Sequence, residues 1–146
     1  MITHSIQDII DVLKKGDISG IPTETVYGLG ANGLDEKAVQ KIFTVKGRPN
    51  KNPLILHTHS LEEVSKLVQE IPPLAKKLAD HYWPGPLTIL FDKSALVSDL
   101  ITAGSSKVAI RIPNHPMFLE ILQSVDFPIA APSANPYQSI SPTTAQ

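Results

Sequence analysis

The chain of 146 residues has the length of one domain, and 42% hydrophobic against 18% charged residues is ordinary for a soluble globular protein. A formal net charge of −1 gives no overall field that favours nucleic acid or a membrane, and the absence of cysteine excludes disulfides, thiolate metal sites and a cysteine nucleophile. No apolar run approaches the roughly 20 residues of a membrane span, so we expect a cytoplasmic protein without membrane contacts.

Three helices are expected in the first half of the chain, each where a capping side chain precedes apolar residues at helical spacing. The short apolar stretches 18–22 and 53–57 predict buried strands, and residues 23–33 predict a loop because they combine polar side chains with three glycines. The expected helices are 6–15 after Ser5, 36–46 after Asp35 and 61–68 after Ser60.

The second half is expected to add two helices and three strands. Residues 87–91, 108–112 and 129–131 predict the strands, and alternation within the second strand places Arg111 on the face opposite Ile110. The helices begin at Pro72 and after Asn114. The first is expected to face inward with Leu74, Ala75, Leu78, Ala79 and Tyr82, and the second carries the apolar residues Met117, Phe118, Ile121 and Leu122 at helical spacing. Interleaved strands and helices predict an α/β or α+β protein around one mostly buried sheet.

The two arginines, Arg48 and Arg111, stand out among eleven lysines. A guanidinium grips phosphate or carboxylate with two prongs, so arginines in glycine- and proline-framed positions indicate an anionic small molecule. Lys46 and Arg48 flank a glycine and would clamp one polyphosphate if the segment is extended, with Asn52 placed to bond a base or a phosphate. The alternative is a basic helix C-terminus favoured by the helix dipole, which accounts for Lys46 but not for Arg48.

Residues 37–61 contain five lysines and arginines but no acid. This pattern fits a solvated helix face as well as it fits a basic wall that attracts phosphate or RNA. The neighbouring segment 23–27 places Thr25 and Tyr27 after a buried strand, which fits either a recognition loop for a small polar ligand or a hydrogen-bonded turn. Residues 28–33 match the dinucleotide glycine pattern only weakly, since no acid follows at the required distance.

Two further polar pairs have rival explanations. His57 and His59 lie at alternate positions of a predicted strand, but no third metal ligand is evident nearby, so His57 is better explained as a single donor to a carboxylate. Ser133 and Asn135 lack the glycine elbow of a serine hydrolase, and hydrogen bonding to a nucleotide phosphate explains them better.

Six motifs in a fixed order make the chain resemble the YrdC-like family of threonylcarbamoyl-AMP synthases, from about Asp17 to the end. They are residues 21–30, 46–49, 52–57, 82–88, 108–113 and 131–135. The resemblance implies a twisted open sheet, mainly parallel, with flanking helices and a basic concave face. It implies a nucleotidyltransferase that joins L-threonine, bicarbonate and ATP into threonylcarbamoyl-AMP and releases pyrophosphate. The product would serve threonylcarbamoyladenosine modification of tRNA through a downstream threonylcarbamoyl-transferase complex.

The same resemblance implies roles for individual residues. The catalytic signatures fall on Lys46, Arg48, Ser133 and Asn135. Contacts to L-threonine map to Thr25, Tyr27, His57, Arg111 and Ala131. Contacts to ATP map to Arg48, Asn52, Lys107, Ser133 and Ser141. No metal bound by the protein itself is implied, and Mg²⁺ is expected to arrive on the nucleotide.

The chain departs from the family pattern at two places. Lys107 stands where the family usually has a threonine, so that ATP contact is expected to be changed or supplied by Ser106. Family domains typically continue for several more elements, so residues 1–146 are expected to form a single YrdC-like domain that lacks its C-terminal elements.

Two alternatives to the synthase remain. One is a non-catalytic paralogue that binds double-stranded RNA or tRNA, and the other is a YciO-like or hydrogenase-maturation carbamoyl-transfer domain. The enzyme is favoured because the chain retains the catalytic signatures, whereas shape-based RNA binding needs only diffuse charge. These signatures are Lys46, Arg48, Ser133 and Asn135.

Overall fold

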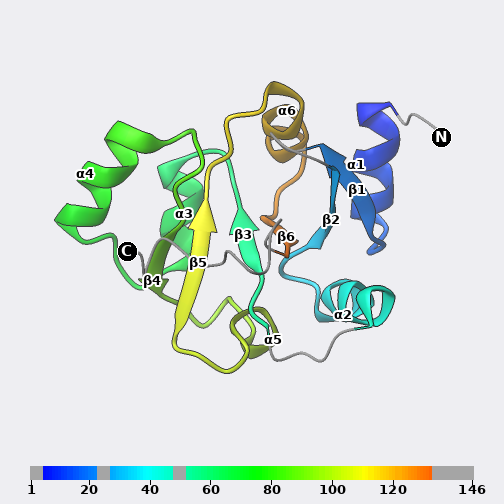
Figure 1. Cartoon of the computed structure of the whole chain (residues 1–146), viewed down its shortest axis with the longest axis horizontal. Coiled ribbons are helices and arrows are strands. Elements are labelled where there is room, and N and C mark those ends of the chain that lie inside the picture. The colour runs from blue at the N-terminus through cyan, green and yellow to red at the C-terminus, as the bar shows by residue number, and fades with distance from the viewer. Residues whose placement is uncertain (1–4, 23–26, 48–51, 133–146) are drawn as a thin grey trace.

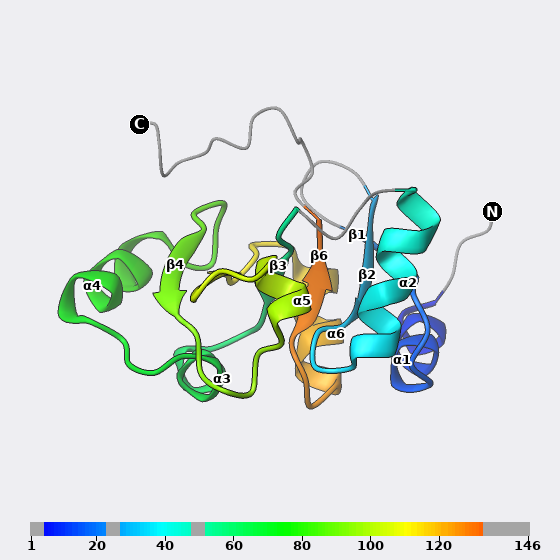
Figure 2. The same ribbon diagram turned by 90° about the horizontal axis from the view of Figure 1, so that it is seen from below.

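The structure is a computed structural model that describes residues 5–22, 27–47 and 52–132. Helices and strands alternate within these residues, with the α1 end and the α4 end at opposite sides of the molecule (Figures 1 and 2). The elements are α1 (Ile6–Lys14), β1 (Ser19–Pro22), β2 (Tyr27–Asn32), α2 (Glu36–Lys46), β3 (Ile55–His57), α3 (Leu61–Leu67), α4 (Pro73–Tyr82), β4 (Ile89–Asp92), α5 (Asp99–Thr102), β5 (Lys107–Arg111), α6 (Pro116–Ser124) and β6 (Ile129–Ala131).

The described strands form one open sheet in the order β1-β2-β6-β3-β5-β4. The expected α/β class, with an open sheet and flanking helices, is confirmed. The expectation of a mainly parallel sheet is wrong, because only β3 and β5 pair in parallel and the other four described pairings are antiparallel. The physical reason is connectivity: β2 returns beside β1 after a connection of four residues, which only an antiparallel pair allows, and β6 inserts antiparallel between β2 and β3.

Strand β2 lies in the segment that we expected to be a loop. Its glycines serve close packing rather than turning, since a Cβ on Gly30 would stand 2.6 Å from Ile21 Cγ1 and 2.9 Å from Ile129 Cγ2. Glycine inside a strand often marks such a close approach. The expectation of a loop over 23–33 is therefore wrong for residues 27–32.

Capping side chains begin the helices largely as expected. The side chains of Ser5, Asp35 and Ser60 accept hydrogen bonds from backbone N–H groups in the first turns of α1, α2 and α3. The expected cap of α6 is wrong by one residue, because the accepting group is Nδ1 of His115 rather than the side chain of Asn114.

The two faces of the sheet are covered unequally. Residues paired directly across neighbouring strands project to the same face. One face, called here the closed face, carries Leu56, Ile110 and Ala130, all fully buried in one core with residues of α2, α3 and α5. The other, called here the half-open face, carries Ile55, His57, Leu90, Ala109, Arg111, Ile129 and Ala131.

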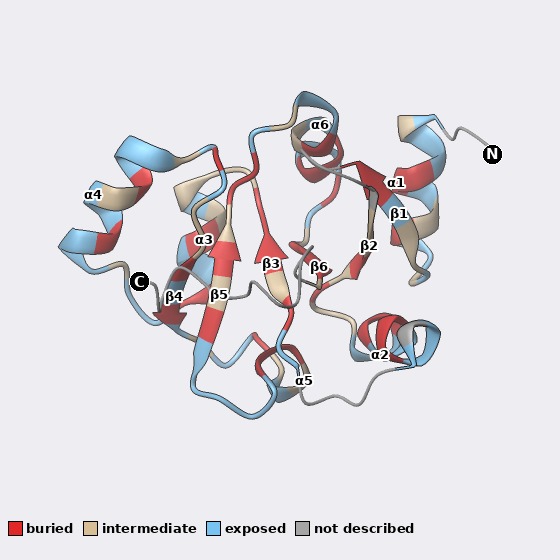
Figure 3. Cartoon of the chain, viewed as in Figure 1, coloured by how far each residue is buried: buried red, intermediate tan, exposed pale blue. Residues whose placement is uncertain are grey.

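On the half-open face, the helices that the structure describes cover the side toward β2. Ile129 belongs to a second buried cluster with residues of α1 and α6, including Phe118. Toward β4 the face opens: Ile55 and Ala109 are half-buried, and the Leu90 side chain is 49% exposed. Strands β3 and β6 at the sheet centre are mostly buried, as Figure 3 shows.

Helix α4 contributes less to the core than its sequence pattern predicted. Ala75 and Ala79 are buried as expected, but Leu74 and Tyr82 are 68% and 56% exposed, so their expected inward orientation is wrong. They occupy the first and last turns of a helix at the margin of the sheet, where no described element lies over them (Figure 3). No helix among the described residues is long and apolar enough to cross a membrane.

Candidate functional site

His57 and Arg111 stand side by side on the half-open face. They are register partners at the last residues of the parallel strands β3 and β5, so both side chains leave the sheet on the same face. His57 is 5% exposed, and Arg111 is half-buried. The carboxyl ends of parallel strands are the usual ligand position in open α/β sheets, so this pair marks the candidate site.

Two contacts fix the His57 ring. Its Nδ1 lies 3.2 Å from the carbonyl oxygen of Ile129 on β6, and its ring centroid lies 5.1 Å from that of Phe118 on α6. Because a carbonyl oxygen only accepts, Nδ1 carries the proton in this contact. In the neutral ring Nε2 is then an acceptor, which suits a hydroxyl or an ammonium better than the carboxylate that the sequence suggested.

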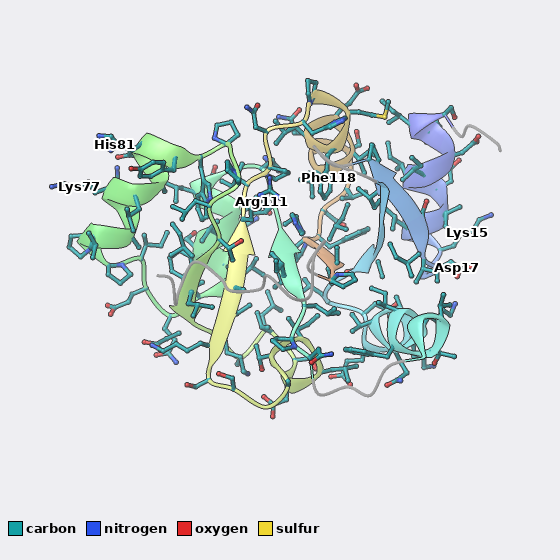
Figure 4. The ribbon with its side chains drawn as sticks, viewed as in Figure 1. Lys15, Asp17, Lys77, His81, Arg111 and Phe118 are labelled. Atoms are coloured by element: carbon teal, nitrogen blue, oxygen red, sulfur yellow. The ribbon has the colours of Figure 1, made fainter. Side chains whose placement is uncertain are left out.

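Hydrogen bonds hold both Arg111 and the residue that follows it at the end of β5. Its Nε donates to the carbonyl oxygen of Gly85 at 2.7 Å, and its own carbonyl oxygen accepts from the Thr58 backbone at 3.2 Å. Gly85 returns a hydrogen bond from its backbone N–H to the Ile112 carbonyl oxygen at 2.9 Å. Figure 4 shows Arg111 and Phe118 toward the middle of the molecule and Lys77 and His81 on the outer side of α4.

The other described candidates are distributed along the same sheet and its borders. Ala131 pairs with Ile55 and shares the half-open face with His57. Asn52 is exposed ahead of β3. Lys107 begins β5, at the end opposite Arg111, and its Nζ lies 2.7 Å from Asp92 Oδ1. The structure therefore brings His57, Arg111 and Ala131 to one face but does not bring Lys107 to the Arg111 end.

Seven candidates lie at the ends of described elements or outside the described residues. Tyr27 begins β2 and Lys46 ends α2, but only their backbones are described. The remaining candidates lie outside the described residues: Thr25, Arg48, Ser133, Asn135 and Ser141. Within the described ranges, no group of three or more His, Cys, Asp or Glu residues could hold a metal ion.

The resolved pKa shifts fall away from this site. The Ile18 backbone N–H and the Lys41 ammonium lower the pKa of Asp17, and a hydrogen bond to Glu63 raises the pKa of Lys66. In the basic segment 37–61, Lys41 forms an ion pair with Asp17 at 3.4 Å. For Lys41 this favours the solvated helix face over a basic wall for nucleic acid.

Sequence reasoning missed two residues that hold the site. Gly85 was singled out only as part of the family motif 82–88, and Phe118 only as a core-facing helix residue, although they contact Arg111 and His57, respectively. The apolar spacing of α6 identified Phe118 as buried, but no sequence signal named the ring that it would face.

An open mixed sheet with His57 and Arg111 at the ends of parallel strands defines an α/β protein with a polar site on one sheet face. The chain belongs to the Sua5/YciO/YrdC family, whose model, described as "Telomere recombination", matches residues 11–146. The expected family resemblance is confirmed.

Two curated relatives and one solved structure illustrate the similarity. The threonylcarbamoyl-AMP synthase of Pyrococcus abyssi is 50% identical over 133 residues, covering 91% of this chain, and that of Bacillus subtilis is 44% identical over 136 residues, covering 92%. The crystal structure of P. abyssi Sua5 complexed with L-threonine superposes with a TM-score of 0.85 at 49% identity, over 89% of this chain and 38% of that one. The chain spans 39% of the length of each curated relative.

Proposed function

We propose that this chain catalyses the synthesis of threonylcarbamoyl-AMP from L-threonine, bicarbonate and ATP. The observation that carries the proposal is the 50% identity to a protein of that name over 91% of this chain. It is supported by the position of His57 and Arg111, paired at the ends of parallel strands on the half-open face. The names of the relatives favour the synthase over the RNA-binding alternative.

L-Threonine would bind at the His57–Arg111 pair. The Arg111 guanidinium would hold the substrate carboxylate, with Nε already committed to Gly85. His57 would accept a hydrogen bond from the threonine hydroxyl or ammonium through Nε2, because its Nδ1 donates to Ile129. Support for threonine as the ligand comes from the P. abyssi relative, whose crystal structure is described as a complex with L-threonine.

The nucleotide would lie beside the threonine. The threonine amine and bicarbonate would form a carbamate with loss of water, and a carbamate oxygen would then attack the α-phosphorus of ATP, so that a new P–O bond forms while the bond to pyrophosphate breaks. Lys46 and Arg48 would stabilise the charge that develops on the phosphoryl oxygens. Hydrogen bonds to the nucleotide would come from Asn52, Ser133, Asn135 and Ser141. Lys107 would have to give up its ion pair with Asp92 to reach a phosphate.

Mg²⁺ would enter on the nucleotide. The described residues fit an ion carried by phosphate oxygens rather than a resident one, since they present no cluster of three metal-ligating side chains. Bound in this way, the ion would neutralise phosphate charge during the displacement. The product would pass to a threonylcarbamoyl-transferase complex for tRNA modification in the cytoplasm.

The test is pyrophosphate release from ATP by the purified chain, with L-threonine and bicarbonate supplied together and singly. We expect release that requires both and that falls sharply in Arg48→Ala. Lys76→Ala is the matched control, since Lys76 is an exposed cation of α4 paired with Asp80. Absence of threonine-dependent release, together with salt-sensitive binding of double-stranded RNA, would contradict the proposal and support the RNA-binding alternative.

A further inference from the structure

The turn between α4 and β4 holds the candidate threonine-binding arginine through its backbone. The Gly85 carbonyl oxygen accepts from Arg111 Nε at 2.7 Å, and the Gly85 N–H donates to the Ile112 carbonyl oxygen at 2.9 Å. One residue of the turn thus holds both the side chain of Arg111 and the backbone that follows it. A residue bonded at both its N–H and its C=O has little freedom to shift without moving Arg111.

The turn itself is braced on both sides. The indole Nε1 of Trp83 donates to the Leu87 carbonyl oxygen at 2.7 Å, and the Trp83 ring packs against Phe91 of β4 at 6.5 Å between centroids. Gly85 is buried, and a Cβ added there would lie 2.4 Å from the Tyr82 carbonyl oxygen, a backbone atom that cannot rotate away. Glycine is therefore required for the turn to approach the end of α4 this closely.

We propose that Gly85 is a positioning residue for Arg111, and that the braced turn Trp83–Leu87 orients the guanidinium to grip the substrate carboxylate. This inference rests on the proposed binding of L-threonine at Arg111. A two-pronged contact depends on the orientation of the guanidinium plane, and holding Nε fixes that plane. The turn acts through Arg111 and makes no contact with the reacting atoms.

The first test observes the contact directly. The sequence has two arginines, so the ¹⁵N spectrum contains two Nε–H signals, and an Arg48→Lys variant leaves that of Arg111 alone. We expect slow hydrogen exchange at Arg111 Nε–H in the unsubstituted chain, because it is bonded to Gly85, and faster exchange in Gly85→Ala. Fast exchange in the unsubstituted chain would overturn the proposal.

The second test measures its consequence for binding. In Gly85→Ala we expect the Kd for L-threonine to rise about ten- to a hundredfold, the range that a displaced positioning group produces, with the Kd for ATP unchanged. Gly16→Ala is the control: this glycine has φ +84, so alanine strains the fold there too, but it lies after α1, far from Arg111. The control should lose stability and keep its threonine affinity.

A double-mutant cycle separates positioning from general destabilisation. If Gly85 acts through Arg111, then Gly85→Ala should add little to the loss of threonine affinity already caused by Arg111→Lys. Additive effects would overturn the proposal, as would unchanged threonine affinity in Gly85→Ala.

A milder variant covers the case in which Gly85→Ala does not fold. Trp83→Phe keeps an aromatic ring but removes the indole N–H that bonds to Leu87. Like Gly85→Ala, it should speed exchange at Arg111 Nε–H and weaken threonine binding, but by less. Unchanged threonine affinity despite faster hydrogen exchange at Arg111 Nε–H would overturn the proposal. If the unsubstituted chain fails to bind threonine, the proposed function fails on its own, and the exchange of Arg111 Nε–H still tests the contact with Gly85.

Discussion

The two faces of the sheet contrast in what covers them. On the closed face, Leu56, Ile110 and Ala130 are fully buried beneath helices. On the half-open face, the described residues of α6 pack against His57 through Phe118, whereas Leu90 remains 49% exposed. The boundary between covered and open surface falls at His57 and Arg111, which places the polar candidates where apolar packing ends.

This contrast separates what stabilises the fold from what serves the site. Burial of apolar area on the closed face supplies much of the stabilisation, and substitutions there should act on folding first. The candidate site needs partial exposure, so its residues can change with less effect on the core. Phe118 is the exception, since it belongs to the core of α6 and also packs on His57.

The largest expected effect therefore belongs to Phe118→Ala. Removing this fully buried ring should lower the free energy of unfolding by about 3–5 kcal/mol and also release the His57 ring. Urea titration gives the stability, and threonine titration of the remaining folded protein gives the affinity. Phe118→Leu should restore most of the stability and less of the affinity. Full affinity in both variants would show that the ring does not support the site.

Arg111→Ala should give the next largest effect, and mainly on function, although the buried Gly85 carbonyl oxygen also loses its donor. Loss of a charged two-pronged contact is worth about 2–4 kcal/mol, the scale of one missing oxyanion donor, so threonine affinity should fall by more than tenfold. Calorimetry measures the affinity, and thermal unfolding should shift little. Lys76→Ala is the control, because it removes an exposed cation of α4 that is paired with Asp80. Equal losses in both variants would contradict a local role for Arg111.

Asp35→Ala should affect the closed face without affecting the candidate site. The Asp35 carboxylate caps α2, which covers the closed face, and its loss should lower stability by about 1 kcal/mol. Asp35→Ser keeps an acceptor and should recover most of that loss in a denaturation curve. Threonine affinity should stay unchanged in both variants. A weakened affinity in Asp35→Ala would mean that the two faces are coupled more closely than their packing indicates.

The smallest effect should appear at Asp17, which joins the α1 side of the sheet to α2 through Lys41. The Ile18 N–H and Lys41 hold the pKa of Asp17 below its ordinary 3.8. A lowered folded pKa stabilises the fold above the unfolded pKa, and this contribution is lost as the pH falls through the folded pKa.

Thermal melts across pH should therefore show Asp17→Asn slightly less stable at neutral pH. The difference should shrink as the pH falls below about 3.8. A difference that does not change with pH would contradict this assignment.

Much of the fold could be predicted because its signals are local. Ser5, Asp35 and Ser60 cap helices that their sequence pattern predicted, and the strand at Arg111 alternates as expected. Strand direction is not local: nothing in residues 129–131 indicates that they insert between β2 and β3. Strand β2 was missed because its glycines suggest a turn, whereas Ile21 and Ile129 fill the space beside Gly30, where a side chain would otherwise stand.

The candidate site could be predicted only in part. The rarity of arginine identified Arg111, and the family motifs identified His57. Which ring nitrogen of His57 carries the proton, however, depends on the carbonyl oxygen of Ile129, a residue far away in the sequence. The ion pair of Lys107 with Asp92 likewise depends on the register of β4 against β5. Such contacts are set by tertiary packing, which periodicity and motifs do not encode residue by residue.

The central position of β6 has a consequence for synthesis on the ribosome. Ala31 and Ala130 are partners across the β2–β6 pairing but lie about a hundred residues apart in sequence. Until β6 emerges, β2 and β3 each lack a neighbour, and His57 lacks the Ile129 carbonyl that orients its ring. Such distant pairings make folding slow, so the nascent chain would expose the edges of β2 and β3 until β6 is made, and the His57 contact would form only then.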